Sequence, residues 1–191
     1  MANIDALDDL TSRHPNIRLF GPIDDNMLKS FLGQLAEARD HPGPIVLELS
    51  TTGGNADTAR RMALEIRLAR RLWGKDLFFF GKTMVYSAGV TLMAAFPPER
   101  RILSADTRLL IHERHMDKSI HFTGALRASL ALARDLVAEI EIGQQLEREG
   151  FEELVAGSSL SLDDLMARVM SQDWYVSATE ALRLGLVGRL A

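Results

Sequence analysis

Apolar segments of strand length alternate with longer amphipathic segments along this chain, and that alternation restricts its fold more than any other feature. Residues 45–50 (IVLELS) and 76–84 (DLFFFGKTM) are continuous apolar runs typical of buried strands. Between them, residues 56–73 are rich in alanine, leucine and arginine, which predicts a helix. Strands that alternate with helices define the α/β class.

The rest of the chain continues this pattern. Further strands are expected at residues 17–20, 108–115 and 119–124, and further helices at residues 24–40 and 124–150. No repeat, linker or low-complexity tract divides the chain. We therefore predict a flexible N-terminal arm over residues 1–16 and a single domain over residues 17–191.

The helix expected over residues 124–150 carries a wide apolar surface. We expect this surface to be buried by the rest of the domain or by a neighbouring subunit. Its main stripe is formed by Leu126, Leu130, Ala133, Val137 and Ile140. Two later helices begin with capping boxes, at Ser161 with Asp164 and at Ser177 with Glu180.

Composition excludes several classes of function. The net charge of −4 gives no general attraction to nucleic acid or to an anionic membrane. The absence of cysteine excludes disulfides, thiolate zinc sites and a cysteine nucleophile. No metal-ligand cluster and no phosphate-binding glycine motif occurs, so we expect no metal and no cofactor. No signal peptide and no apolar run of about 20 residues is present, and we expect a cytoplasmic protein.

A basic cluster lies in the helix expected over residues 56–73. We interpret it as a solvated or subunit-facing side rather than a phosphate groove. The cluster comprises Arg60, Arg61, Arg67, Arg70 and Arg71.

One serine stands at the start of a short apolar helix, in MVYSAGVTLMAAF (residues 84–96). Ser87 could be an ordinary N-cap, which contributes about 1 kcal/mol. It could also be a nucleophile, because the first amides of a helix are unpaired and the Ala88 amide is then available to an oxyanion. Taken alone, the stretch favours the N-cap.

Each other group needed for serine hydrolysis also has a candidate. His112 ends an apolar strand and could act as the base, with His115 and His121 as rivals. Asp173 lies beside two aromatic residues and could orient an imidazole. Gly54 follows the strand at residues 45–50, where glycine lets a backbone amide approach a ligand.

The order of these motifs resembles the proteolytic subunit of Clp protease (peptidase family S14), which has the ClpP/crotonase fold. STTGG (residues 50–54) is similar to the family's glycine turn, YSAG (86–89) to its nucleophile motif and LIHE (110–113) to its base motif. The most specific match is DWYVSATEALRLGLV (173–187), which carries the family's acid onto Asp173. The resemblance covers roughly residues 17–190.

The resemblance implies a fold of repeated β-β-α units with a protruding strand–helix handle. It implies a serine endopeptidase with the triad Ser87, His112 and Asp173, and with an oxyanion hole formed by the Gly54 and Ala88 amides. Peptides or unfolded proteins would be the substrates. A homo-oligomer of heptameric rings and an AAA+ unfoldase are the implied partners, and neither nucleic acid nor a membrane is expected.

The sequence also departs from the family pattern. Thr52 replaces a proline in the glycine turn, Ala88 replaces a methionine, and residues 113–130 lack the family's Gln-Pro and glycine-rich handle. Two alternatives therefore stay open, a non-catalytic scaffold subunit and a crotonase-fold acyl-CoA enzyme. A serine–lysine hydrolase would use Lys82, five residues before Ser87.

Overall fold

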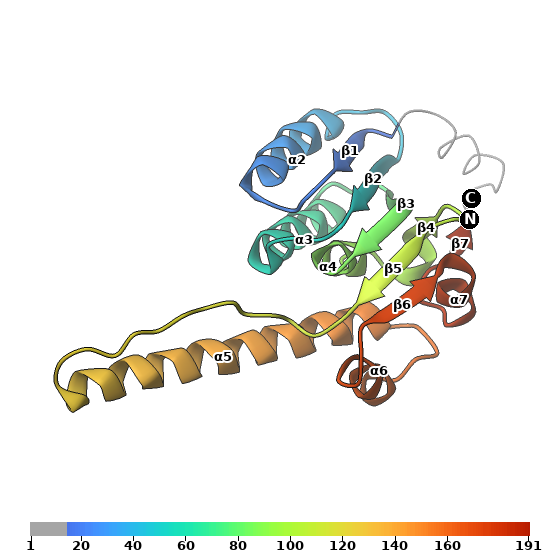
Figure 1. The fold of residues 1–191 in the computed structure, drawn as a ribbon. Helices are drawn as coiled ribbons and strands as arrows, with labels where there is room; N and C mark the ends of the chain where they lie inside the picture. Colours follow the sequence, from blue (N-terminus) through green and yellow to red (C-terminus); the bar gives the residue numbers. More distant parts are fainter. Residues whose placement is uncertain (1–14) are drawn as a thin grey trace.

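The structure is a computed structural model that describes residues 15–191 (Figure 1). The expected arm over residues 1–16 lies outside the described residues as far as residue 14. Asn16, the last residue of that range, joins the fold, because its side-chain oxygen accepts a hydrogen bond from the Val46 amide at 2.7 Å.

One seven-stranded sheet organises the chain, with the path β1-β2-β3-β4-β7 and with β5 paired to β3 and β6 paired to β5. Every pair is parallel except β5 with β6. The strands are β1 (Ile17–Phe20), β2 (Ile45–Thr51), β3 (Leu77–Tyr86), β4 (Arg101–Leu103), β5 (Arg108–Ile111), β6 (Trp174–Ser177) and β7 (Arg189–Leu190).

Six α-helices and one 3₁₀ turn connect the strands of the described residues. They are α2 (Asp25–Ala38), α3 (Ala56–Leu72), α4 (Ala88–Ala94), η1 (Pro98–Arg100), α5 (Leu126–Val155), α6 (Leu162–Val169) and α7 (Ala178–Arg183). The alternation of helices and strands confirms the predicted α/β class. The N-cap bond of each predicted capping box is confirmed, because the side chains of Ser161 and Ser177 each accept the amide three residues later at 3.1 Å.

The sheet has two apolar faces, as strand alternation requires. On one face, odd-numbered residues of β1 and β2 such as Leu19 and Leu47 pack with Phe31 of α2 and Met62 of α3 in the main core. The other face carries a smaller buried cluster of Val46, Phe78, Phe80 and Ile102. Continuous burial on both faces explains why β2 and β3 read as uninterrupted apolar runs.

Strand β3 changes its neighbour partway along its length. Its residues 79–81 pair with β4, and its residues 84–86 pair with β5. Between the two sets Thr83 has a φ of 59°, and the register with β2 shifts. This irregularity directs the end of β3 toward the β5–β6 pair rather than toward β4.

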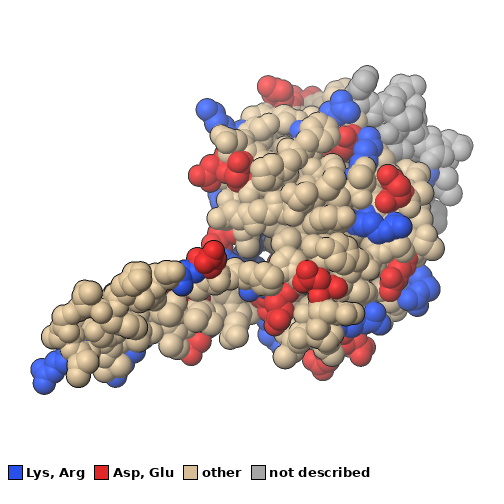
Figure 2. Space-filling view, in the orientation of Figure 1, with Lys and Arg blue, Asp and Glu red and all other residues tan. Residues whose placement is uncertain are grey.

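Helix α5 is 30 residues long and projects from the body of the molecule (Figures 1 and 2). Its apolar stripe is not buried by this chain. Exposed side chains include Leu126, Leu130, Leu132, Val137, Ile140 and Ile142. Of the two alternatives for this stripe, burial by the rest of the domain is therefore wrong.

The strand predicted at residues 119–124 is not formed. Residues 112–125 have no helix or strand and run beside α5 (Figure 1). The prediction was wrong because a strand needs a neighbouring strand to satisfy its amides and carbonyls, and no described strand lies beside this segment. The strand predicted over residues 108–115 likewise ends early, at Ile111.

Arg101 anchors the base of α5 and the end of α4. The side chain is almost fully buried and donates to the carbonyls of Phe96, Leu154 and Leu186 at 2.7, 3.0 and 2.9 Å. Burial lowers the pKa of Arg101 to about 10 by desolvation, so the guanidinium stays charged at neutral pH. The Arg101 guanidinium thus joins the end of α4, the end of α5 and the loop before β7.

Candidate active site

Ser87 occupies the sharp turn between β3 and α4. Its backbone angles, φ 53° and ψ −117°, lie in a region that costs a non-glycine residue about 1–3 kcal/mol. The hydroxyl makes no capping hydrogen bond to α4, so the interpretation as an ordinary N-cap is wrong. The Ser87 amide donates to the Leu110 carbonyl at 2.8 Å, which fixes the turn against β5.

The glycine turn after β2 packs directly against Ser87. A Cβ added at Gly53, where φ is 98°, would lie 2.7 Å from the Ser87 Cβ. A Cβ at Gly54, where φ is 146°, would lie 2.4 Å from the Ile23 carbonyl oxygen. Both positions therefore require glycine, for conformation and for space.

Two backbone amides beside Ser87 are unpaired. Neither the Gly54 nor the Ala88 N–H has a hydrogen-bond acceptor among residues 15–191. Unpaired amides at the first turn of a helix and at a glycine turn are suitable donors to a developing oxyanion.

His112 and Asp173 lie just beyond the same end of the β5–β6 ladder. That antiparallel ladder ends with the pair of Ile111 and Trp174. His112 and Asp173 are the next residues beyond this last pair on the two strands. A histidine and an aspartate thus leave the ladder at the same end.

Most of the predicted site residues line one cavity of about 330 Å³. Gly54, Ser87, Ala88 and His112 all line it, whereas Asp173 is not among its lining residues. The apolar part of the wall comes from α4 and α5 and comprises Val90, Leu146, Phe151 and Leu154.

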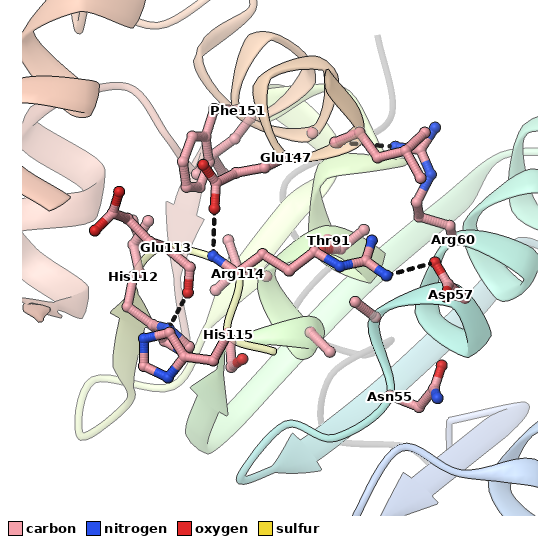
Figure 3. A pocket seen from close by; sticks show the side chains of 18 of the residues that line it. Asn55, Asp57, Arg60, Thr91, His112, Glu113, Arg114, His115, Glu147 and Phe151 are labelled. Carbon is pink, nitrogen blue, oxygen red and sulfur yellow. Dashed lines mark hydrogen bonds and ion pairs between the residues drawn. The ribbon is translucent and has the colours of Figure 1, made fainter. Parts of the chain in front are cut away.

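The His112 ring is oriented by the backbone rather than by Asp173. Its Nδ1 donates to the Glu113 carbonyl oxygen at 2.5 Å, and its ring contacts that of His115 at a centroid distance of 4.8 Å (Figure 3). A proton on Nδ1 leaves Nε2 as the acceptor, which is the tautomer a general base for serine needs. A neutral carbonyl, however, stabilises the charged imidazolium less than a carboxylate does.

Three charged residues at the cavity were not predicted from the sequence. Arg114 extends across the cavity, and its guanidinium contacts the Asp57 carboxylate at 2.9 Å (Figure 3). The backbone amide of Arg114 donates to the Glu147 carboxylate of α5. Asp57 and Arg114 are 57 positions apart, so no local pattern indicates this contact.

The interpretation of the arginine cluster in α3 as a solvated or subunit-facing side is wrong for three of its members. Arg60 donates to the Leu146 carbonyl and to Glu149, and Arg67 donates to Glu153, so both fasten α3 to α5. Arg70 donates at 2.7 Å to the Ala95 carbonyl at the end of α4. These cations therefore pair with oxygens of α5 and of the end of α4 within the chain.

Lys82 is not positioned as the base of a serine–lysine hydrolase. Its ammonium donates at 2.8 Å to the buried Glu48 on the second face of the sheet and lies over the Phe80 ring. It is not among the residues that line the cavity. That alternative is therefore wrong.

Metal-binding clusters and membrane-spanning helices are both absent from the described part of the chain. Residues 15–191 contain no group of three or more histidines and carboxylates that could hold a metal ion. No helix in the same range combines the length and apolar character needed to cross a membrane.

The fold and the cavity together define an α/β protein with a serine at a strained strand-to-helix turn and two free amides beside it. Comparison with known proteins identifies one family. The Clp protease family model matches residues 3–191. The chain therefore belongs to the Clp protease family.

Curated relatives and a solved structure agree with this assignment. The ATP-dependent Clp protease proteolytic subunit 2 of Gluconobacter oxydans is 27% identical over 91% of this chain and 72% of its own length. Subunit 2 of Treponema pallidum is 25% identical over 91% and 80%. The structure of a ClpP1 mutant from Listeria monocytogenes superposes with a TM-score of 0.74 at 17% identity, over 98% of this chain and 96% of that one. The predicted ClpP-like fold is thereby confirmed.

Proposed function

We propose that this protein is a serine endopeptidase that cleaves peptides or unfolded proteins. One observation carries the proposal. Ser87 is held in a strained turn with its hydroxyl free of a capping bond, and it shares a cavity with His112 and with the unpaired amides of Gly54 and Ala88. Strain of this kind persists where the surroundings impose it, and it concentrates at active sites.

The proposed roles follow from the chemistry of each group. Ser87 Oγ attacks the substrate carbonyl, and His112 Nε2 accepts its proton and later transfers it to the leaving amine. The Gly54 and Ala88 amides stabilise the tetrahedral oxyanion, and water then hydrolyses the acyl-enzyme. Asp173 accepts the hydrogen bond of the His112 Nδ1–H once the ring leaves the Glu113 carbonyl.

A serine-reactive probe tests this proposal directly. A fluorophosphonate should label the wild-type chain at Ser87, as located by mass spectrometry of the digested protein, and Ser87→Ala should abolish labelling. Ser171→Ala is a matched control, because Ser171 is an exposed serine outside the cavity. Absence of labelling in every assembled form of the wild type would refute the peptidase assignment.

A non-catalytic scaffold subunit is the second candidate. It is favoured by the orientation of His112, whose Nδ1 is bonded to the Glu113 carbonyl, and by the absence of Asp173 from the cavity lining. The purified chain alone separates the two candidates. Cleavage of small fluorogenic peptides that is lost in Ser87→Ala supports the peptidase, whereas activity only after mixing with another subunit that carries its own nucleophile supports the scaffold.

We also propose a cytoplasmic homo-oligomer of heptameric rings. Support comes from the exposed stripe on α5, where Leu126 alone is 87% exposed, because an apolar surface of this extent is typical of a contact between subunits. The relatives named above are ATP-dependent, which supports an AAA+ unfoldase as partner. In sedimentation, Leu130→Glu should shift the wild-type assembly to smaller species, whereas Leu72→Glu on α3 should not. A wild type that sediments as a monomer would contradict this proposal.

A further inference from the structure

Residue 114, two positions after His112, is fastened to both walls of the cavity. The Arg114 guanidinium contacts Asp57, in the first turn of α3, at 2.9 Å. The Arg114 amide donates to the Glu147 carboxylate of α5. Figure 3 shows the Arg114 side chain lying between the segment after β5 and the start of α3.

These contacts determine where His112 can point. His112 lies between the end of β5 at Ile111, which is fixed by the sheet, and Arg114, which is fixed by α3 and α5. With Ile111 and Arg114 both held in place, the Glu113 carbonyl oxygen lies 2.5 Å from the His112 Nδ1. The same nitrogen cannot donate to Asp173 while it donates to Glu113, although Asp173 leaves the β5–β6 ladder at the same end as His112.

We propose that Arg114 is a positioning residue that holds His112 away from Asp173 and so keeps the peptidase site in a low-activity state. The inference rests on the proposed function of Ser87 and His112. Release of the Arg114 contacts frees residues 113–115, which allows the His112 ring to exchange the Glu113 carbonyl for the Asp173 carboxylate. Substrate enters the cavity that Arg114 lines, and it is therefore the proposed competitor for these contacts.

The contacts are weak enough to be released. The Arg114 side chain is 29% exposed and the Asp57 side chain 65% exposed. An ion pair in such surroundings shifts a two-state equilibrium by about two- to five-fold. We therefore expect its loss to raise the rate of reaction at Ser87 by about the same factor, and not by orders of magnitude.

Arg114 also lines the cavity, so an effect on His112 must be separated from a direct contact with substrate. A small fluorophosphonate reacts at Ser87 and leaves the rest of the cavity empty, and its labelling rate reports the nucleophile alone. In peptide cleavage, release of His112 raises kcat, whereas loss of a direct contact changes KM.

The experiment compares labelling rates of the full-length wild type with Arg114→Gln, Arg114→Lys and Asp57→Asn, with thermal melting of each variant measured alongside. We expect a two- to five-fold increase for Arg114→Gln and for Asp57→Asn, and no further increase in the double variant, because both remove one contact. Arg114→Lys, which keeps the charge, should stay near the wild-type rate. Arg148→Gln, which breaks an exposed ion pair within α5 to Glu152, is the control and should leave the rate unchanged.

Each outcome decides between the proposals. Wild-type labelling at Ser87 without an increase in Arg114→Gln and Asp57→Asn refutes the positioning role and leaves the proposed function intact. Independent, multiplicative effects of the two substitutions also refute it. No labelling in any variant refutes the proposed function and this inference together. As a second measurement, long-range ¹H–¹⁵N spectra should show a change at His112 Nδ1 in Arg114→Gln, and an unchanged Nδ1 resonance refutes the positioning role.

Discussion

Replacement of Arg101 by methionine tests how the halves of the candidate site are joined. The side chain is 1% exposed, and it donates to carbonyls at the ends of α4 and α5 and in the loop before β7. Methionine has a similar length, fills the same space with apolar atoms and donates no hydrogen bond. The substitution therefore removes the hydrogen bonds while leaving most of the packing volume.

The expected loss can be worked from the contacts. Three carbonyls, those of Phe96, Leu154 and Leu186, lie within 3.0 Å of Arg101 nitrogens. Each buried carbonyl left without a donor costs about 1–3 kcal/mol, and the cost is reduced because a charge no longer has to be buried. Burial desolvates that charge, which lowers the pKa of Arg101 to about 10. We expect a net loss of about 3–5 kcal/mol, a large fraction of the roughly 5–15 kcal/mol that stabilises a typical domain.

Urea unfolding followed by tryptophan fluorescence measures this loss, because Trp73 and Trp174 report on α3 and β6. Variants are compared at one protein concentration, since assembly would add to apparent stability. Arg148→Met removes an exposed arginine of α5 and is the control, with an expected change below about 0.5 kcal/mol. An Arg101→Met variant within about 1 kcal/mol of the wild type would show that the carbonyls find other partners and that the reasoning is wrong.

Three further substitutions test local geometry. Gly54→Ala places a Cβ 2.4 Å from the Ile23 carbonyl oxygen, and it should lower the free energy of unfolding by at least about 2 kcal/mol and kcat by about 10²–10³-fold. Gly33→Ala is the comparison, because its Cβ meets open space in α2. It should raise the free energy of unfolding by about 0.5–1 kcal/mol. An active, fully stable Gly54→Ala would contradict the assigned turn. Ser177→Ala removes the cap on the Glu180 amide and should lower the melting temperature by an amount equivalent to about 1 kcal/mol, and an unchanged melting curve would contradict that role.

The elements that sequence reasoning predicted well are those whose causes are local. Strand β1 was predicted at its observed bounds, and α3 differs from its prediction by one residue, because apolar periodicity and the Asn55 cap fix them. The strand predicted at residues 119–124 failed for the opposite reason. Its alternating residues fit a strand, but pairing depends on a neighbour that no local pattern supplies.

The candidate site likewise has features with local causes and features that depend on long-range contacts. The glycine turn follows from small residues at fixed places, so STTGG indicated it, whereas the strain at Ser87 was not predicted, because the stretch around it favoured an ordinary N-cap. The contacts of Arg114 were not predictable in this way. They join residues on α3 and α5 that are 57 and 33 positions away, and charged residues at such distances have many alternative partners.

Catalytic competence in this chain therefore depends on more than the presence of the right residue types. The β5–β6 ladder ends beside both His112 and Asp173, and this follows from backbone pairing rather than from either side chain. In the structure the imidazole instead donates to the Glu113 carbonyl, in a segment whose Arg114 contacts α3 and α5. We propose that these contacts set the direction of the ring, so that a substrate entering the cavity can act on His112 through Arg114. In the proposed function, the base His112 is coupled to α3 and α5 through the segment that carries Arg114, and substitution of Arg114 and Asp57 tests that coupling.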